Sequence, residues 1–470
     1  MADPDKTNYF FCGVGGSGMT PLAAYLAQAG HPVSGSDRSH DQQKSPRKFV
    51  ALSDAGITLF PQDGSGILPG TDCLVVSSAV EDSVPDVRAA KARNLPIVTR
   101  GQLLAELFNA AKVRIAVAGT SGKSTVTGMT GTILTGLGLD PTVVNGGIIR
   151  NFMQGGFKDY FANVRAGRPD LFVAEMDESD GSIAFYKPSI ALLNNIALDH
   201  KPIEELQDLF LDYLKRTEGA VILNSDDPAL RGLLPRLRGR EVLTYGIEGE
   251  GLSLRAEEIR YRPDGVDFVL AVKDGGAFPV RLRVPGRHNV LNALGALCVA
   301  IALKADVGKA VEALEAFRGI HRRMEVIGTV RDITVLDDFA HNPDKISASL
   351  QSLKTFEGRL IVFYQQHGFK PLERMRREFA DSFVSHLSQD DLVLMPDVFY
   401  AGGTVERKVT AADFVTDLQQ RGLDARWKPT REELLQVIKQ EARPGDRVVI
   451  MGARDDTLNE FAQQVLAALA

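Results

Sequence analysis

The chain has 470 residues, about three times the length of one typical compact domain, so we expect several domains rather than a peptide or a single binding module. Hydrophobic residues make up 44% and charged residues 24% of the chain, values that exclude wholesale disorder. The 54 Lys and Arg residues against 60 Asp and Glu residues give a net charge of −6. The chain therefore lacks the net positive charge that would indicate nucleic acid or an anionic membrane as a partner.

The chain has three cysteines and no Cys-x-x-Cys pair, which predicts neither a disulfide scaffold nor a zinc finger. The first residues lack a cationic start followed by an apolar core, so we expect no signal peptide. No unbroken apolar run reaches the roughly 18 residues of a membrane-spanning helix. We expect a cytoplasmic protein, either a monomer or a homodimer, that does not insert into a membrane.

The first glycine-rich turn, Gly13-Val-Gly-Gly-Ser-Gly18, follows an apolar strand predicted over Tyr9–Cys12 and precedes a helix predicted over 19–30. This order of strand, glycine turn and helix is typical of nucleotide-binding folds. Asp37 ends the next apolar step, where such folds place an acid that binds a ribose. A bare turn is the alternative, but Asp37 favours a nucleotide that carries phosphate. The other predicted elements of this domain are strands at 31–36, 72–78 and 95–98 and a helix at 85–94.

A second glycine-rich loop, Gly119-Thr-Ser-Gly-Lys-Ser-Thr125, lies between a strand predicted over Val113–Ala118 and a helix that extends to about residue 137. Free backbone N–H groups, Lys123 and the Ser124 hydroxyl suit the phosphates of ATP and a bound Mg²⁺. Val117 stands where the general P-loop pattern has a glycine, so the loop is a shorter variant. A glycine turn with a solvated lysine is the alternative.

Polar clusters follow the next two predicted strands of this domain. The acidic run 175–180 follows a strand at 171–174, and the run 194–200, from Asn194 to His200, follows a strand at 190–193. Ligand sites of α/β folds lie at the carboxyl ends of strands, and carboxylate oxygens suit a hard cation. A solvated acidic loop and an ordinary hydrogen-bonded histidine are the alternatives.

Amide side chains begin a helix predicted over 288–305. Asn289 and Asn292 stand one turn apart at its start, where they could contact an adenine edge. Helix capping by Asn289 is an equally good interpretation.

From Arg323 the alternation of strands and helices starts again, which predicts a third α/β domain. The run Asp337-Asp338-Phe-Ala-His341 follows a strand and places acids beside an imidazole. The predicted strands are at 333–336, 360–364, 392–395 and 448–451, and the predicted helices at 372–387 and 456–469.

Taken in order, these motifs resemble those of the Mur ligases, the ATP-dependent amide-forming enzymes of peptidoglycan precursor synthesis. The resemblance covers essentially the whole chain, and it rests on the strings GVGGSGM, AVAGTSGKST, VNGG, AEMDESD, LNNIALDH and PGRHNVLNA. It implies an α/β protein of three domains: a Rossmann-like UDP-sugar domain at 1–110, a central P-loop ATPase-like domain at 111–322 and a C-terminal Rossmann-like domain at 323–470 that binds an amino acid or peptide.

The resemblance also implies a reaction. An amino acid, L-alanine first, would be joined to the lactyl carboxylate of UDP-N-acetylmuramate through an acyl phosphate, with ATP and Mg²⁺ as cofactors and Mn²⁺ as an alternative metal. A murein tripeptide is the alternative amine, because the segments around Arg322 and Asp338 resemble the branch of the family that recycles such peptides.

Residue roles follow from the same resemblance. Catalysis is assigned to Lys123, Glu175, His200, Arg323 and His341. ATP would contact Gly119, Thr120, Ser121, Gly122, Lys123, Ser124, Thr125, Asn195, His288, Asn289, Asn292, Arg323 and Asp338. The UDP-sugar would contact Gly15, Gly16, Ser17, Gly18, Asp37, Ser78 and Asn145. The amine site would include His341, His367 and Lys370, and the metal ligands would be Ser124, Glu175 and His200.

Three positions depart from the pattern of the nearest branches of the family. Ser121 stands where they have a histidine, Ser124 replaces a threonine, and Gly368 stands where the alanine-adding branch has an arginine associated with its substrate. Ser124 keeps the hydroxyl, but Ser121 and Gly368 keep a second hypothesis open, a catalytically weak protein that binds a sugar nucleotide. A nicotinamide-dependent dehydrogenase, suggested by the first glycine turn alone, leaves the second phosphate loop unexplained.

Overall fold

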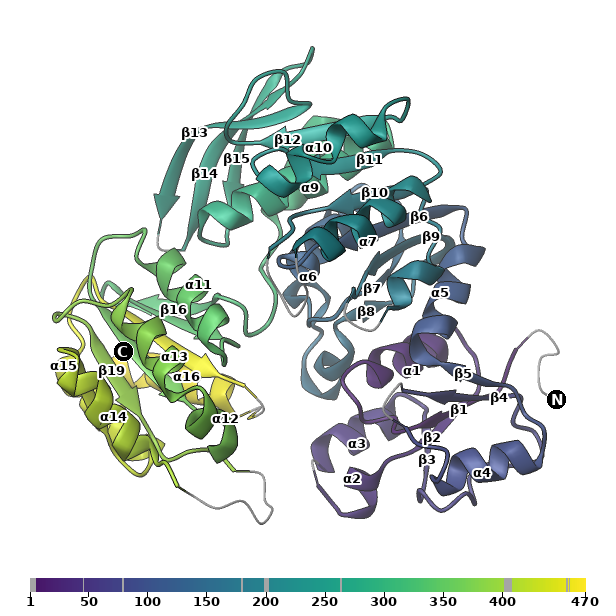
Figure 1. The fold of residues 1–470 in the computed structure, drawn as a ribbon, viewed down its shortest axis with the longest axis horizontal. Coiled ribbons are helices and arrows are strands. Elements are labelled where there is room, and N and C mark those ends of the chain that lie inside the picture. Colours follow the sequence, from purple (N-terminus) through teal and green to yellow (C-terminus); the bar gives the residue numbers. More distant parts are fainter. Residues whose placement is uncertain are drawn as a thin grey trace. The chain divides into compact units, whose positions relative to one another are not determined.

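The computed structural model of the chain is shown in Figure 1. It describes residues 6–44, 46–77, 80–178, 181–197, 203–262, 264–400, 408–453, 455 and 457–470. The chain forms two compact units. The first comprises Met1–Ile259, Phe268–Val280 and His288–Arg318, and the second comprises Arg260–Asp267, Arg281–Arg287 and Gly319–Ala470. Three sheets lie within 1–110, 111–322 and 323–470, although the domain boundaries near 110 and 322 stay a prediction.

The first sheet has five parallel strands in the order β3-β2-β1-β4-β5, the arrangement of a Rossmann half. Its strands are β1 (Tyr9–Cys12), β2 (Val33–Ser36), β3 (Thr58–Phe60), β4 (Cys73–Val76) and β5 (Ile97–Thr99). Its helices are α1 (Met19–Gln28), α2 (Arg38–Asp41), α3 (Pro46–Asp54), α4 (Pro85–Ala92) and α5 (Arg100–Ala110).

The central strand β1 is apolar along its whole length because helices cover both faces of the sheet. Tyr9 and Phe11 point into the core formed with α1, α3 and α5. Phe10 and Cys12 point into the opposite core, beside Val87 of α4. Both faces of the sheet are thus covered around β1, so a ligand is expected at its carboxyl edge.

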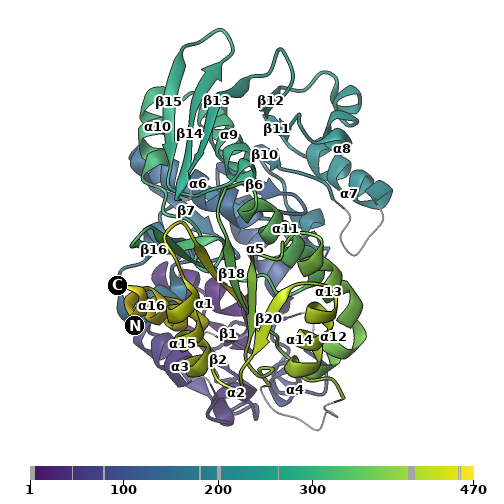
Figure 2. The same cartoon turned by 90° about the vertical axis from the view of Figure 1, so that its left-hand side faces the viewer.

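The second sheet has ten strands in the order β15-β14-β13-β12-β11-β10-β6-β9-β7-β8, and Figure 2 shows β13, β14 and β15 at one end of it. Its strands are β6 (Val113–Ala118), β7 (Pro141–Val144), β8 (Val164–Arg165), β9 (Arg168–Glu175), β10 (Ile190–Leu193), β11 (Val221–Asn224), β12 (Val242–Gly246), β13 (Leu254–Arg262), β14 (Gly265–Val272) and β15 (Ala277–Leu282). Its α-helices are α6 (Lys123–Gly136), α7 (Ile203–Lys215), α8 (Pro228–Arg231), α9 (Arg287–Ala302) and α10 (Val307–Glu315). Short 3₁₀ turns are η1 (Arg150–Phe152), η2 (Gly156–Phe161), η3 (Ser182–Phe185) and η4 (Leu234–Leu237).

Strand β6 lies between β9 and β10 and runs parallel to both. In this register Val117 is opposite Glu175 and Ala118 is opposite Leu193. Parallel strands end at the same edge, so the Gly119–Thr125 loop, Glu175 and the residues after Leu193 meet there.

The third sheet has six strands in the order β16-β17-β21-β18-β19-β20, of which β16 and β17 pair antiparallel and the others are parallel. Its strands are β16 (Glu325–Val330), β17 (Ile333–Asp338), β18 (Leu360–Gln365), β19 (Leu392–Met395), β20 (Asp424–Trp427) and β21 (Arg447–Gly452). Its helices are α11 (Pro343–Leu353), α12 (Phe369–Arg374), α13 (Arg376–Val384), α14 (Ala411–Gln420), α15 (Arg431–Glu441) and α16 (Leu458–Leu469).

The structure confirms the α/β class and most predicted elements, with several strands matching within two residues. One predicted helix was wrong: the segment 372–387 is split at Met375, whose backbone leaves the helical region at φ −116°, and α13 ends at Val384. Among the described residues, no helix is both long and apolar enough to cross a bilayer.

The first sheet leaves no space for a side chain at Gly35. A Cβ atom there would lie 2.7 Å from the Phe11 carbonyl oxygen and 2.9 Å from Val14 Cβ. We expect Gly35→Ala to destabilise the protein by about 1–3 kcal/mol, because backbone on the neighbouring strand has to move. Gly70→Ala is the control, since the nearest atom to a Cβ at that position is 3.9 Å away. The midpoint of thermal unfolding by circular dichroism measures both, and equal midpoints for the two variants would contradict the prediction.

Candidate active site

The first glycine turn is fixed by backbone contacts to the neighbouring strand. The Gly13 and Val14 N–H groups donate to the Ser36 carbonyl oxygen at 2.8 and 2.9 Å. The Gly15 N–H donates to Asp37 Oδ2 at 2.9 Å. Asp37 Oδ1 accepts from the Ser39 N–H at 2.8 Å and so caps α2. Both carboxylate oxygens of Asp37 thus shape the turn, and its contact with a nucleoside stays a prediction.

Two cations border this turn, and the sequence motifs did not single them out. The Lys48 ammonium donates to the Gly15 carbonyl oxygen at 2.5 Å. The Arg100 side chain lies against Gly18, because a Cβ at position 18 would come 3.0 Å from Arg100 Cδ. Nothing in the local sequence distinguishes these two residues from the other basic ones. Ser78, assigned to the same ligand, lies outside the described residues.

The second glycine loop is held by two asparagines that follow β10. The Thr120 N–H donates to the Asn195 carbonyl oxygen at 3.1 Å, and the Ser121 N–H donates to Asn195 Oδ1 at 2.8 Å. Asn195 Nδ2 donates back to the Ser121 carbonyl oxygen at 2.9 Å. Asn194 Nδ2 donates to the same oxygen at 3.1 Å. The loop is therefore preformed, with Ser121 at its exposed tip.

Gly122 ends the loop in the left-handed region at φ 79°, where a side chain is disfavoured. A Cβ there would also lie 2.5 Å from Asn194 Nδ2 and 2.7 Å from Asn292 Oδ1. This close approach brings α9, which carries Asn292, against the loop.

The predicted adenine contacts include an amide network that the structure uses internally. Asn292 Oδ1 accepts from Asn194 Nδ2 at 2.9 Å, and Asn292 Nδ2 donates to Asn289 Oδ1 at 3.1 Å. The Tyr245 hydroxyl donates to Asn194 Oδ1 at 2.7 Å, and burial raises the pKa of Tyr245 well above its ordinary value, so this donor keeps its proton. The motifs did not single out Tyr245. His288 is exposed at the start of α9.

Lys123 begins α6 and makes an internal ion pair. Its ammonium donates to the Gly119 carbonyl oxygen at 2.7 Å and to both carboxylate oxygens of Glu178, at 2.9 and 3.1 Å. Glu178 belongs to the acidic run after β9, but within that run the family resemblance favoured Glu175, as a metal ligand. Only the alignment of the strands identifies which acid reaches the lysine.

The predicted metal ligands Ser124 and Glu175 are neighbours. Ser124 Oγ donates to Glu175 Oε2 at 2.8 Å, and the Gly146 N–H donates to the same oxygen at 2.7 Å. A hydroxyl and a carboxylate side by side are hard oxygen ligands of the kind Mg²⁺ prefers, so these two residues fit the ion. His200 lies outside the described residues. Within the described part of the chain, no three His, Cys, Asp or Glu residues cluster as a metal site.

Asn145 lies beside this pair, at the end of β7. Its Nδ2 donates to the Gly147 carbonyl oxygen at 2.8 Å and to the Ser124 carbonyl oxygen at 3.2 Å. Its Oδ1 is buried and has no hydrogen-bond partner among the described residues. A buried orphan acceptor of this kind suits a ligand donor.

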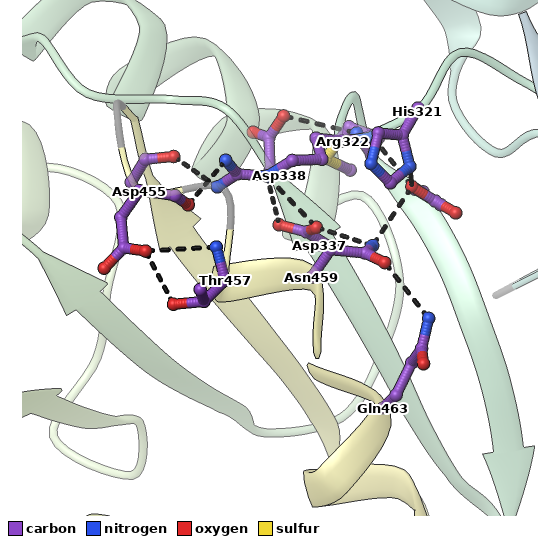
Figure 3. A network of polar contacts seen from close by, with 11 residues as sticks. His321, Arg322, Asp337, Asp338, Asp455, Thr457, Asn459 and Gln463 are labelled. Carbon is purple, nitrogen blue, oxygen red and sulfur yellow. Dashed lines mark hydrogen bonds and ion pairs between the residues drawn. The ribbon is translucent and has the colours of Figure 1, made fainter. Parts of the chain in front are cut away.

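Two arginines that are adjacent in the sequence have different surroundings in the second unit. Arg322 is buried and donates to Asp337 at 3.2 Å and to the carbonyl oxygens of Gly452 and Asp455 at 2.7 and 3.1 Å (Figure 3). Arg323 is exposed. The guanidinium of Arg322 is thus engaged within its own unit, which favours Arg323 as the arginine for a ligand.

Asp338 is buried in the same network, where its Oδ1 accepts from the Met324 N–H at 3.2 Å and its Oδ2 accepts from the Ser349 hydroxyl. Burial raises the pKa of Asp338 above its ordinary value. These contacts fix the start of the C-terminal unit, and a contact between Asp338 and ATP stays a prediction.

The residues assigned to the amine lie at one edge of the third sheet. The rings of His341 and His367 have centroids 5.4 Å apart, and His341 Nδ1 is 2.8 Å from the Phe339 carbonyl oxygen. Lys370 is exposed in α12. Gly368, just before that helix, has φ 74°, a conformation that an arginine would adopt only with strain. An arginine at this position would therefore need a different local backbone to avoid that strain.

Comparison with known proteins gives three adjoining family matches. Residues 8–112 match the Mur ligase family, catalytic domain; residues 117–300 match the Mur ligase middle domain; and residues 322–454 match the Mur ligase, glutamate ligase domain.

Two relatives of nearly the full length carry the same name. The UDP-N-acetylmuramate–L-alanine ligase of Solibacter usitatus is 37% identical over 453 residues, which cover 94% of this chain and 92% of that protein. The ligase of the same name from Jannaschia sp. is 34% identical over 470 residues, 98% of this chain and 95% of that protein.

Solved structures resemble the whole chain. The crystal structure of UDP-N-acetylmuramate–alanine ligase from Thermotoga maritima has a TM-score of 0.74 at 25% identity and covers 98% of both chains. That of a murein peptide ligase from Psychrobacter arcticus has a TM-score of 0.65 at 26% identity, with the same coverage. Three domain matches in order, together with relatives above 30% identity over nearly the full length, establish that this chain belongs to the Mur ligase family.

Proposed function

We propose that this enzyme joins L-alanine to UDP-N-acetylmuramate in a reaction driven by ATP. The observation that carries the proposal is the preformed loop around Lys123, with Ser124 and Glu175 beside it, in a chain that aligns over nearly its full length with ligases named for this reaction. A phosphate loop at the start of a helix, next to a pair of oxygen ligands, is suited to phosphoryl transfer.

The chemistry explains why such a loop is needed. A carboxylate does not accept an amine near neutral pH until one of its oxygens becomes a good leaving group. We propose that the lactyl carboxylate oxygen of UDP-N-acetylmuramate attacks the γ-phosphorus of ATP and that ADP leaves. The amine nitrogen of L-alanine then attacks the acyl carbon, loses its proton and expels phosphate.

We assign the following residues of this chain to the phosphoryl group, the metal ion, the sugar nucleotide and the amine. Lys123 and the N–H groups of its loop neutralise charge on the transferring phosphoryl group. Bound Mg²⁺, or Mn²⁺, held by Ser124 and Glu175 with His200, supplies further positive charge at the phosphates. The glycine turn at 13–18, with Lys48 and Arg100, binds the diphosphate of the UDP-sugar, and Asn145 Oδ1 accepts a hydrogen bond from that substrate. In the second unit, His341, His367 and Lys370 bind the amine, and Arg323 contacts ATP.

A murein tripeptide is the second candidate for the amine. It is favoured by the likeness to the murein peptide ligase from Psychrobacter arcticus and by the segments around Arg322 and Asp338, which resemble that branch of the family. The curated full-length relatives above support L-alanine instead.

Lys123→Ala is expected to lower the turnover of ATP by roughly 100- to 1000-fold, since it removes one preorganised positive group from the transferring phosphate. Binding of UDP-N-acetylmuramate should stay within about twofold of wild type, because the contacts assigned to that ligand, the glycine turn of the first sheet and Asn145, do not include the Lys123 side chain. ADP release in a coupled assay measures the first quantity, and calorimetric titration with the sugar nucleotide measures the second. Lys112→Ala, at an exposed lysine of the same unit, is the control. Equal loss of ATP turnover and of sugar-nucleotide binding in Lys123→Ala would contradict the separate assignment of the two ligands.

The amine substrate is identified by supplying one amine at a time. With UDP-N-acetylmuramate and Mg²⁺ present, we expect L-alanine to give faster ADP release than L-serine, glycine or a murein tripeptide, and the product mass to increase by one alanyl group. Reactions without the sugar nucleotide serve as blanks. Fastest release with the tripeptide would establish the second candidate. ADP release that depends on none of the four amines, while the sugar nucleotide still binds, would favour a protein that binds without ligation.

A further inference from the structure

The ammonium group of Lys123 is surrounded by three hydrogen-bond acceptors, as many as it has hydrogens. A lysine ammonium carries three hydrogens. Here the acceptors within hydrogen-bond distance are the Gly119 carbonyl oxygen at 2.7 Å and the two oxygens of Glu178 at 2.9 and 3.1 Å. A phosphate oxygen can reach this ammonium only if one of these acceptors gives up its hydrogen bond.

The pair is also largely removed from water, with the Lys123 and Glu178 side chains 16% and 9% exposed. An ammonium in such a place is strongly disfavoured without an anionic partner. Glu178 supplies that partner and keeps the lysine side chain folded over the loop.

A phosphate oxygen and a carboxylate oxygen offer the lysine the same chemistry, a negatively charged acceptor. The two anions repel each other if both stay beside one ammonium group. Gly119, by contrast, is neutral, so its carbonyl contact does not compete through charge. The acceptor that phosphate replaces is therefore the carboxylate.

We infer that Glu178 is a positioning residue that takes the place of a nucleotide phosphate on Lys123 and is displaced when ATP binds. The inference rests on the proposed function, because it requires Lys123 to contact a nucleotide. Its consequence is that Glu178 weakens the binding of both ATP and ADP while it keeps the loop ready to receive them.

Glu178→Gln tests this directly, since it keeps the length of the side chain and removes its charge. We expect the Kd for ADP with Mg²⁺ to fall about tenfold, because the glutamine amide carries no negative charge to compete with phosphate and offers Lys123 one acceptor oxygen in place of two. Glu178→Asp keeps the charge but shortens the reach, so its Kd should lie between those of Glu178→Gln and wild type. Asp177→Asn makes the same charge change at the neighbouring exposed carboxylate and should stay within about twofold of wild type.

The measurement is isothermal titration of the full-length enzyme with ADP and Mg²⁺, without sugar nucleotide or amine. Weaker or unchanged ADP binding in folded Glu178→Gln would overturn the inference, since a residue with only a structural role loses affinity when replaced. If Glu178→Gln does not fold, Glu178→Asp decides the direction of the effect. Failure of the wild-type enzyme to bind ADP would instead count against the proposed nucleotide site itself.

Discussion

The close packing of two asparagines against Gly122 is the constraint on which the candidate active site depends. Asn194 follows β10 and Asn292 lies in α9, and both approach the glycine so closely that no side chain fits there. The contact fixes the end of the loop and therefore the direction in which α6 leaves it. The contact therefore also sets the positions of Lys123 and Ser124, the first residues of α6.

The same constraint ties the sheet to the chemistry. Because β6, β9 and β10 are parallel neighbours, the loop, Glu175 and the asparagines reach one edge from separate stretches of sequence. The loop supplies backbone N–H groups and a lysine, the end of β9 and the residues after it supply carboxylates, and the segment after β10 supplies amides. Hydrogen bonds between the stretches hold the loop in place.

Much of this edge could be predicted from the sequence, for a physical reason. Strands buried on both faces are apolar throughout, and the polar run that follows each of them marks the point where the chain reaches the edge. Such a pattern located the loop that carries Lys123 and Ser124 and the acidic run 175–180, and the family resemblance favoured Glu175 within that run. The pattern could not locate Lys48 or Arg100, or show that Glu178 pairs with Lys123, because these contacts depend on which strands are neighbours and on side-chain reach.

The buried network of the second unit illustrates the same limit. Arg322 and Arg323 are adjacent and identical in type, yet one is enclosed by Asp337 and two carbonyl oxygens while the other is exposed. Sequence distinguishes them only through a family pattern. The structure distinguishes them by burial. The buried guanidinium of Arg322 is held by hydrogen bonds within its own unit, because a buried charge is costly unless it is paired. The ribbon of β13, β14 and β15 escaped prediction for a related reason, since its strands mix charged and apolar residues without a clean alternation.

If the amine contacts the segment around Gly368, as proposed, the backbone there has a consequence for engineering the enzyme's choice of amine. Its φ of 74° and the proline three residues later define a path of the chain, not merely a missing side chain. Grafting an arginine onto this path would place its guanidinium where the strained backbone directs it. Transplanting the specificity of a relative would thus require exchange of the whole segment from the end of β18 through α12, so that backbone and side chain change together.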